Sequence, residues 1–269
     1  MTIEPMLAQN ALQFAIEKAT PEGKATIVVL LLLSLFSWTI IITKVRQLII
    51  ARRAAKKFFE AYSATRDPLD IQKRGEEFDG APAYQLYQRG AEEVAYHLKN
   101  NPVIVTTVTS SGIGEGNTDH LARANTVKIS ASSFEAVKVV MEEAASAEAM
   151  SLEKGMIVLS TAVAGGPFIG LLGTVWGVMS TFAGIAVAQQ ASLTAMAPGV
   201  AAALVATVTG LLVAIPAMFS YNFMVTTIRH ITMELDGFAS RYANQIEHAY
   251  VDSRDIEDKI AEALKRHVT

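Results

Sequence analysis

The stretch that decides the fold runs from Gly165 to Gly184 and reads GGPFIGLLGTVWGVMSTFAG. It lies within a longer segment, residues 155–228, that contains no Asp, Glu, Lys or Arg. Because one membrane-spanning helix needs about 20 apolar residues, this segment is long enough for two. Small residues recur at helical spacing on one face of the first helix: Gly170, Gly173, Gly177 and Gly184. Small residues let helices approach closely in lipid, so we expect this face to be a helix-packing surface.

The composition of the 269-residue chain favours a membrane protein. Hydrophobic residues make up 51% of it and charged residues 18%, and the hydrophobic ones are concentrated in a few uncharged blocks. The net charge of -3 gives no support to nucleic-acid binding. The chain has no cysteine, which excludes disulfides and thiolate metal sites, and its five histidines lack ligand spacing. We therefore expect neither a metal nor a cofactor.

The first uncharged apolar block reads TIVVLLLLSLFSWTIIIT over residues 26–43. It is longer than the core of a signal peptide and no small-residue cleavage site follows it, so we interpret it as an uncleaved membrane anchor. Six basic residues lie between Lys44 and Lys57, whereas only Lys18 and Lys24 precede the block. The positive-inside rule therefore places the N-terminus outside and Lys44 inside.

These patterns predict an all-α integral membrane protein with three transmembrane helices that continue into long cytoplasmic helices. The seven predicted segments are a periplasmic N-terminal segment (1–24), transmembrane helix 1 (25–43), a cytoplasmic helical region (44–154), transmembrane helix 2 (155–188), a periplasmic loop (189–194), transmembrane helix 3 (195–228) and a cytoplasmic C-terminal helix (229–269). In the first segment, residues 8–18 fit an interfacial helix or a frayed leader equally well, and Pro21 and Gly23 are expected to interrupt any helix.

The cytoplasmic region is expected to hold helices over residues 45–62, 83–99 and 119–154, the last running directly into transmembrane helix 2. Between the second and third of these, Val103 to Thr109 is β-branched and is followed by Gly112, Gly114 and Gly116. A strand leading into a phosphate-binding loop is one interpretation. The fingerprint spacings of such loops are absent, so we favour a flexible loop. In the C-terminal helix, apolar residues at helical spacing predict a packing face: Leu235, Phe238, Tyr242 and Ile246.

A second stripe of small residues lies on transmembrane helix 3, at Gly199, Ala203, Ala206, Gly210, Ala214 and Ala217. Pro167 and Pro216 are expected to kink the two core helices, because proline removes a backbone hydrogen bond. For Thr174 and Thr207, spacing alone favours hydroxyl groups that bond to the carbonyl oxygens of their own helices.

The segments GPFIGLLGTVWGVMSTFAGIA and APGVAAALVATVTGLLVAIPAMFSYN resemble the two core transmembrane helices of the MotA/TolQ/ExbB proton-channel family, and most closely those of its TolQ/ExbB branch. The match covers residues 153–222, about a quarter of the chain, and its motifs are long and specific. The three-span layout with an outer N-terminus agrees with the resemblance more loosely.

The resemblance implies a homo-oligomeric ring, with five copies in known relatives, in the bacterial inner membrane. The ring would surround the single transmembrane helices of an ExbD/TolR-like partner, whose intramembrane Asp carries the proton, and a TonB/TolA-like protein is a further partner that the family suggests. Thr174 and Thr207 match the threonines that line the channel, which reverses the preference drawn from spacing. Pro167 and Pro216 match the positions where the helices bend.

One residue departs from the family pattern. ExbB and TolQ usually read G-I-A-E-A-L on the third helix, and here Ala202 stands where the glutamate is expected. No other carboxylate lies in either core helix. MotA-like members also lack this glutamate, so ion transport is not excluded, but the proton route and the choice between H⁺ and Na⁺ remain open.

The favoured function is a proton-channel subunit that couples the proton motive force to work in the periplasm or at the outer membrane. A non-conducting membrane scaffold is an alternative that Ala202 keeps open, and a flagellar-type stator subunit is another, although that family normally has four spans. A membrane-bound enzyme is the least favoured class, because no nucleophile–base pair or carboxylate pair occurs at a useful spacing.

Overall fold

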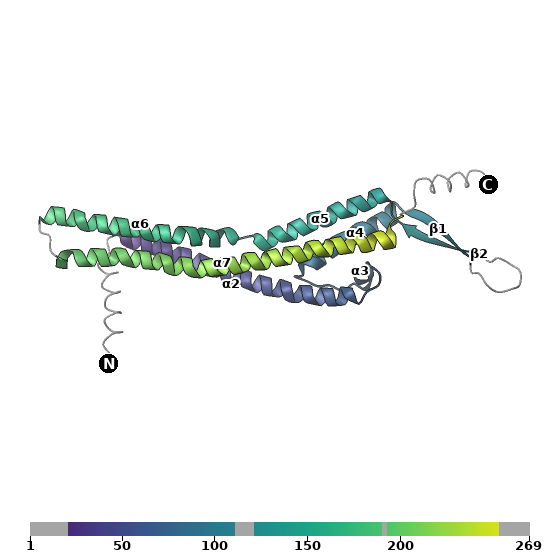
Figure 1. The fold of residues 1–269 in the computed structure, drawn as a ribbon, viewed down its shortest axis with the longest axis horizontal. Coiled ribbons are helices and arrows are strands. Elements are labelled where there is room, and N and C mark those ends of the chain that lie inside the picture. The colour runs from purple at the N-terminus through teal and green to yellow at the C-terminus, as the bar shows by residue number, and fades with distance from the viewer. Residues whose placement is uncertain (1–20, 111–120, 190–192, 253–269) are drawn as a thin grey trace, which may run out of the picture. The chain divides into compact units, whose positions relative to one another are not determined.

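The computed structural model describes residues 21–110, 121–189 and 193–252 (Figure 1). In chain order its elements are α2 (Pro21–Ser63), α3 (Asp70–Arg74), α4 (Pro82–Asn100), β1 (Val103–Ser110), β2 (Leu121–Lys128), α5 (Ala131–Glu153), α6 (Met156–Ala188) and α7 (Leu193–Tyr250). They form two compact units. The apolar unit comprises Met1–Leu48 and Glu153–Ile228, and the polar unit comprises Ile49–Leu152 and Arg229–Thr269. Helices α2 and α7 contribute residues to both.

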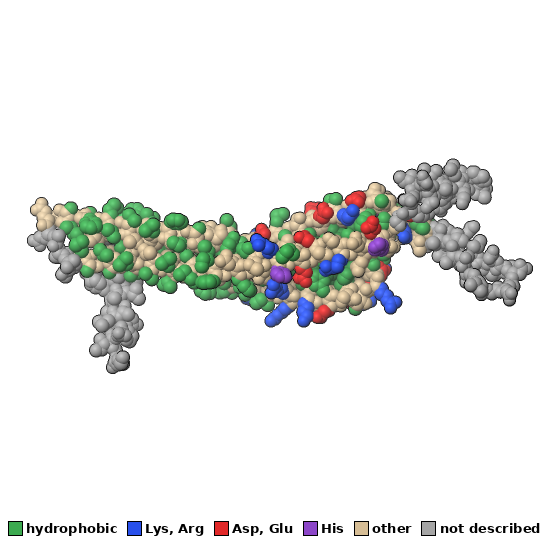
Figure 2. All heavy atoms as spheres, in the orientation of Figure 1, with side chains coloured by type: hydrophobic (Ala, Val, Ile, Leu, Met, Phe, Trp, Pro, Cys, Tyr) green, Lys and Arg blue, Asp and Glu red, His purple; other side chains and the backbone are tan. Residues whose placement is uncertain are grey.

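Three helical stretches of the described chain are long and apolar enough to cross a membrane: Pro21–Ser63, Ala131–Val187 and Gly199–Tyr250. They confirm the three apolar helices of the predicted membrane protein. In the apolar unit large hydrophobic side chains point outward, among them Leu35, Phe168 and Phe219, each more than 60% exposed (Figure 2). An apolar surface of this extent is suited to contact with lipid.

The ends of the membrane helices differ from the sequence-based prediction in two places. Helix α2 begins at Pro21 and includes Gly23, whereas we expected these residues to interrupt a helix. Proline suits the first helical turn, where its missing N–H has no intrahelical partner. The expected continuous helix from residue 119 into the membrane is also wrong, because Gly155 lies between α5 and α6 with φ 89°. Glycine adopts this left-handed conformation readily and ends α5.

Residues 103–110 form a strand rather than the loop that we favoured. Strand β1 pairs antiparallel with β2, in a register that sets Val103 opposite Lys128 and Ser110 opposite Leu121. β-Branched residues fit the pleated backbone of a strand, and this hairpin is the one addition to an otherwise helical fold among the described residues. The described residues do not include the glycines at 112, 114 and 116, most of the outer loop or the tail beyond residue 252. They also do not include residues 8–18, for which an interfacial helix and a frayed leader fitted equally well.

The core of the polar unit is built from aromatic residues. The ring of Phe58 on α2 is fully buried and lies 5.4 Å from that of Phe238 on α7 and 5.7 Å from that of Tyr87 on α4. The predicted packing face of the C-terminal helix is confirmed, because all four of its residues are buried: Leu235, Phe238, Tyr242 and Ile246. Helix α5 adds Val137 and Met141 to the same core.

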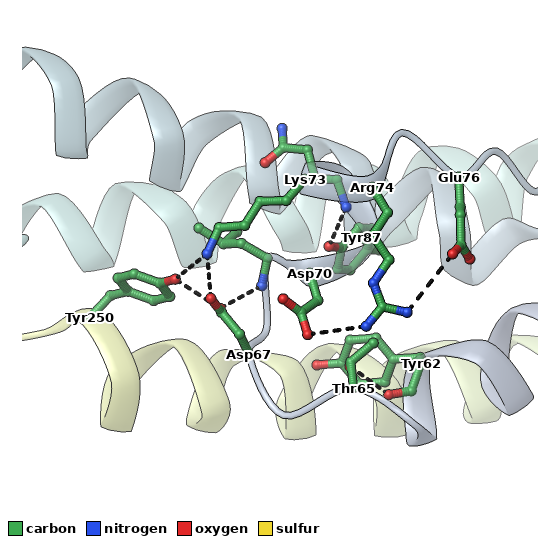
Figure 3. A network of polar contacts seen from close by, with 11 residues as sticks. Tyr62, Thr65, Asp67, Asp70, Lys73, Arg74, Glu76, Tyr87 and Tyr250 are labelled. Carbon is green, nitrogen blue, oxygen red and sulfur yellow. Dashed lines mark hydrogen bonds and ion pairs between the residues drawn. The ribbon is translucent and has the colours of Figure 1, made fainter.

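A polar network ties the turn after α2 to the end of α7 (Figure 3). The hydroxyl of Tyr250 donates a hydrogen bond of 2.7 Å to Asp67. The backbone N–H of Leu69 donates to the same carboxylate at 2.9 Å, and Lys73 forms an ion pair with it. Partial burial disfavours the ionised carboxylate, but the bonds from Lys73, Leu69 and Tyr250 outweigh it and hold the pKa of Asp67 below its usual value. The same segment is fixed to α4, since the N–H of Gln72 donates to the hydroxyl of Tyr87.

Candidate functional site between the core membrane helices

Part of the small-residue stripe on α6 lies against the stripe on α7 within one chain, at Gly170, Gly173 and Gly177, whereas a Cβ added at Gly184 would meet nothing within 4 Å. A Cβ added at Gly170 on α6 would lie 3.0 Å from the carbonyl oxygen of Ala206 on α7, and one added at Gly177 would lie 2.8 Å from the Cβ of Ala203. Both distances are too short for ordinary side-chain contact, so the two helices approach at backbone distance. At Gly170 and Gly177, α6 therefore packs against α7 within the chain.

Two further glycines of the predicted stripes lie in the same packed region. A Cβ at Gly173 would meet Ala206 at 2.7 Å and Thr26 of α2 at 2.9 Å, so three membrane helices converge at this glycine. A Cβ at Gly199 would collide with the hydroxyl of Thr181. The role of Thr26 was missed by sequence reasoning, because a single threonine near the start of an apolar block carries no signal of its contacts.

Thr174 on α6 and Thr207 on α7 are brought into direct contact through their hydroxyl groups. The Thr174 hydroxyl also lies 3.1 Å from the carbonyl oxygen of Gly170 in its own helix and 3.3 Å from that of Ala203 across the contact. The Thr207 hydroxyl lies 3.4 Å from the Gly170 oxygen. Each hydroxyl has a single proton to donate, so the pair can redistribute its hydrogen bonds among these acceptors. Both side chains are half-buried.

The segment of the chain that contains both hydroxyls carries no formal charge. Residues 155–228 contain no Asp, Glu, Lys, Arg or His, so no side chain of this segment can carry a proton by changing its charge near neutral pH. By contrast, the hydroxyl of Thr209, two residues along α7, donates only to the carbonyl oxygen of Val205 in its own helix, at 2.8 Å. The hydroxyl pair is thus distinct from the ordinary membrane threonines around it.

The remaining predicted residues are placed as follows. Ala202 is buried, with 7% of its surface exposed within a single chain. Pro167 lies inside α6 and Pro216 inside α7, and both helices continue through them. The kinks expected at these prolines stay a prediction. Among the described residues no cluster of three or more His, Cys, Asp or Glu side chains is arranged to hold a metal ion.

Known proteins match the sequence of these core helices. The sequence model of the MotA/TolQ/ExbB proton channel family matches residues 113–237, which include both core helices. The chain is 31% identical to the biopolymer transport protein ExbB of Xanthomonas campestris pv. campestris, over 76% of this chain and 78% of that protein. It is 29% identical to the Tol-Pal system protein TolQ of Haemophilus influenzae, over 84% of this chain and 89% of that protein.

A shorter and stronger match exists to the Tol-Pal system protein TolQ of Pseudomonas aeruginosa. The two chains are 47% identical over 89 residues, which is 33% of this chain and only 38% of that TolQ. Together with the three apolar helices and their closely packed small residues, these matches show that the chain belongs to the MotA/TolQ/ExbB proton channel family, in its TolQ/ExbB branch.

Proposed function

We propose that the chain is the ion-channel subunit of an inner-membrane complex that couples the proton motive force to work in the periplasm or at the outer membrane. Its copies form a ring, five in number, around the transmembrane helices of an ExbD/TolR-like partner. The observation that carries this proposal is the contact between Thr174 and Thr207 in a segment without ionisable carboxylates or bases.

The chemistry of this pair explains why a partner is needed. A bare charge inside hydrocarbon is costly, so proton transfer there requires a titratable group or a chain of water molecules. Threonine hydroxyls do not titrate near neutral pH, but they both donate and accept hydrogen bonds. They therefore suit a carboxylate that alternates between its charged and neutral forms. The intramembrane Asp of the single-span partner would supply that group.

Orientation and further partners follow from the same proposal. The basic residues after the first span, such as Arg46 and Arg53, favour a cytoplasmic position for residues 44–154 and a periplasmic N-terminus. The C-terminal helix from residue 229 would then also be cytoplasmic. Force generated in the ring would reach the periplasm through a TonB/TolA-like protein, and the chain itself would have no enzymatic activity.

A non-conducting scaffold is the second candidate, and the residue that favours it is Ala202. Members of the branch usually carry a glutamate here, and this alanine is enclosed by its own chain. If the missing carboxylate were essential to the ion route, the ring would anchor its partner without conducting.

Reconstitution decides between the two candidates. The chain is placed in liposomes alone, with its ExbD/TolR-like partner, and with a partner whose intramembrane Asp is replaced by Asn. We expect proton flux under an imposed gradient only with the unmodified partner. A complex of both proteins that stays silent at every gradient contradicts the channel and favours the scaffold.

A further inference from the structure

The polar unit carries opposite charges on two of its helices. On α2, four basic residues follow one another without an intervening acid: Arg52, Arg53, Lys56 and Lys57. On the part of α5 that belongs to this unit, acids outnumber bases four to one, with Glu135, Glu142, Glu143 and Glu148 against Lys138. Figure 2 shows the basic side chains gathered along the edge of this unit over α2 and acidic ones along the edge over α5.

Each set of charges shares a helix face with exposed apolar residues. At about 100° per residue, Ile49, Arg53 and Lys57 fall within one sector of α2, about 100° wide. On α5 the residues Val139 and Glu143 share a sector of the same width. Met150 belongs to it as well, and Ile49, Val139 and Met150 are 45%, 61% and 67% exposed. We call the sector of α2 with Ile49, Arg53 and Lys57 the basic face, and the sector of α5 with Val139, Glu143 and Met150 the acidic face. The two faces carry opposite charges, and both are partly apolar.

These charges are available for a partner. Lys56 lies 3.9 Å from Glu60 in its own helix, an exposed pair that contributes little to stability. Among the described residues, Arg53, Lys57 and Glu143 take part in no ion pair within the chain. Their electrostatic potential is thus directed outward.

The two faces lie on different sides of α7. One groove of the polar unit runs between α2 and α7, past Arg52 and Glu234. A second groove runs between α5 and α7, past Glu142 and Asp236, and is lined by the small side chains of Ala145, Ala239 and Ala243. The α7 residues of the two grooves are different, and Figure 1 shows α2 and α5 on either side of α7. A molecule with complementary surfaces on separate sides associates head to tail, and such a contact can close into a ring.

We infer that the basic face of α2 in one copy docks against the acidic face of α5 in the next copy, with the two helices running in opposite directions. Lys57 then lies opposite Glu143, and Ile49, eight residues earlier on α2, lies beside Met150, seven residues later on α5. The inference rests on the proposed ring and names the surfaces that join it in the polar unit. The small-residue stripes of α6 and α7 cannot form the main contact between copies. Gly166, Gly170 and Gly177 already pack against α7 of the same chain. Opposite charges across the contact fix its register and exclude wrong pairings.

Disulfide cross-linking tests the contact directly, since the chain has no cysteine of its own. The double variant Lys57→Cys/Glu143→Cys is oxidised in membranes that contain the full chain. A head-to-tail contact predicts a ladder of covalent oligomers that ends at the size of the ring. Each single variant should give no ladder. The matched control is Lys57→Cys/Glu92→Cys, in which the second cysteine replaces an exposed acid on α4, and it should also give none.

Charge reversal supplies an independent measurement by native mass spectrometry. Arg53→Glu/Lys57→Glu and, separately, Glu142→Lys/Glu143→Lys should each lower the fraction of intact rings about tenfold, because like charges then oppose each other. The two reversals combined in one chain should restore rings, and this rescue shows that each variant folds.

The outcomes separate this inference from the proposed function. If rings stay intact, no ladder forms and neither charge reversal has an effect, the α2–α5 contact is wrong, but the proposed ring is not contradicted. Reversal of the α2 charges could instead abolish binding to vesicles of phosphatidylglycerol, with no rescue by the α5 reversal. That result would assign the basic face to lipid and would also contradict the α2–α5 contact. A parent chain that forms no rings contradicts the assembly itself.

Discussion

Gly210 on α7 lies so close to Gly166 on α6 that a Cβ added to it would be 2.5 Å from the Gly166 carbonyl oxygen. A backbone oxygen in a helix cannot move aside without disturbing its own hydrogen bond. We therefore expect Gly210→Ala to force the two helices apart and to cost about 1–3 kcal/mol of stability.

The matched control for this substitution is Gly165→Ala, one residue before Gly166, where an added Cβ meets nothing within 4 Å. Alanine is the better helix former, so this variant should be neutral or more stable by up to about 1 kcal/mol. Thermal unfolding in detergent measures both. Equal melting temperatures for the two variants would contradict backbone-distance packing of α6 on α7.

The aromatic core of the polar unit should depend on Phe58. Its side chain is fully buried and contacts rings from α2, α4 and α7. Removing a large buried aromatic side chain leaves a cavity, so Phe58→Ala should destabilise the chain by about 3–5 kcal/mol. Tyr96→Ala, at a residue that is 56% exposed, is the comparison and should change stability by less than about 1 kcal/mol. A similar loss in both variants would show that the core does not centre on Phe58.

The network around Asp67 predicts a dependence of stability on pH. Because the pKa of Asp67 is lowered in the folded state, its ionised form stabilises the fold. This contribution is complete above the unfolded pKa, about 3.9, and is lost as the pH falls through the lower folded pKa. Asp67→Asn should cost about 1–2 kcal/mol at pH 7.

The gap between the parent chain and Asp67→Asn should narrow as the pH is lowered below about 4. Melting temperatures of both proteins, measured from pH 7 to pH 2.5, follow the gap directly. A control at Asp70→Asn removes a half-buried carboxylate that lies 3.6 Å from Arg74. The Arg74 side chain is exposed, and such ion pairs contribute little, so this variant should have little effect. A gap that stays constant over the whole range would exclude the ionised carboxylate as its source.

How much of this fold follows from the sequence alone depends on the range of the interactions. Helices over 45–62 and 83–99 were predictable, because periodic apolar residues and local breakers such as Pro68 define them. The break at Gly155 was in principle readable as a helix-ending glycine. The hairpin was not, because β1 finds its partner in LARANTVK at residues 121–128, which lacks an alternating pattern.

In the candidate site, too, local features could be predicted from the sequence and long-range contacts could not. The small-residue stripes are visible as a local period, and they do pack helix against helix. That they pair within one chain is set by the register between α6 and α7. The same register brings Thr174 to Thr207 across 33 residues, and only the resemblance to a family, not the spacing, pointed to that pair.

Topology can be checked with single cysteines in this cysteine-free chain. Gln189→Cys, at the exposed end of α6, should react with a membrane-impermeant thiol reagent added to intact spheroplasts. Ser132→Cys, exposed at the start of α5, should react only after the membrane is opened. The asymmetry of Lys and Arg around the first span is the physical reason. The reverse labelling pattern would show that the chain has the opposite orientation in the membrane.

The most direct test of the account is the proton flux of Thr207→Val in liposomes that also contain the partner. Valine keeps the shape of threonine and removes the hydroxyl, so the partner should stay bound while flux falls at least tenfold, in line with the roughly 10²–10⁴-fold contribution of a positioned proton-transfer group. Thr209→Val, whose hydroxyl bonds only to its own helix, should conduct like the parent. Parental flux in Thr207→Val, or an equal loss in both variants, would contradict a role for the Thr174–Thr207 pair in the ion path.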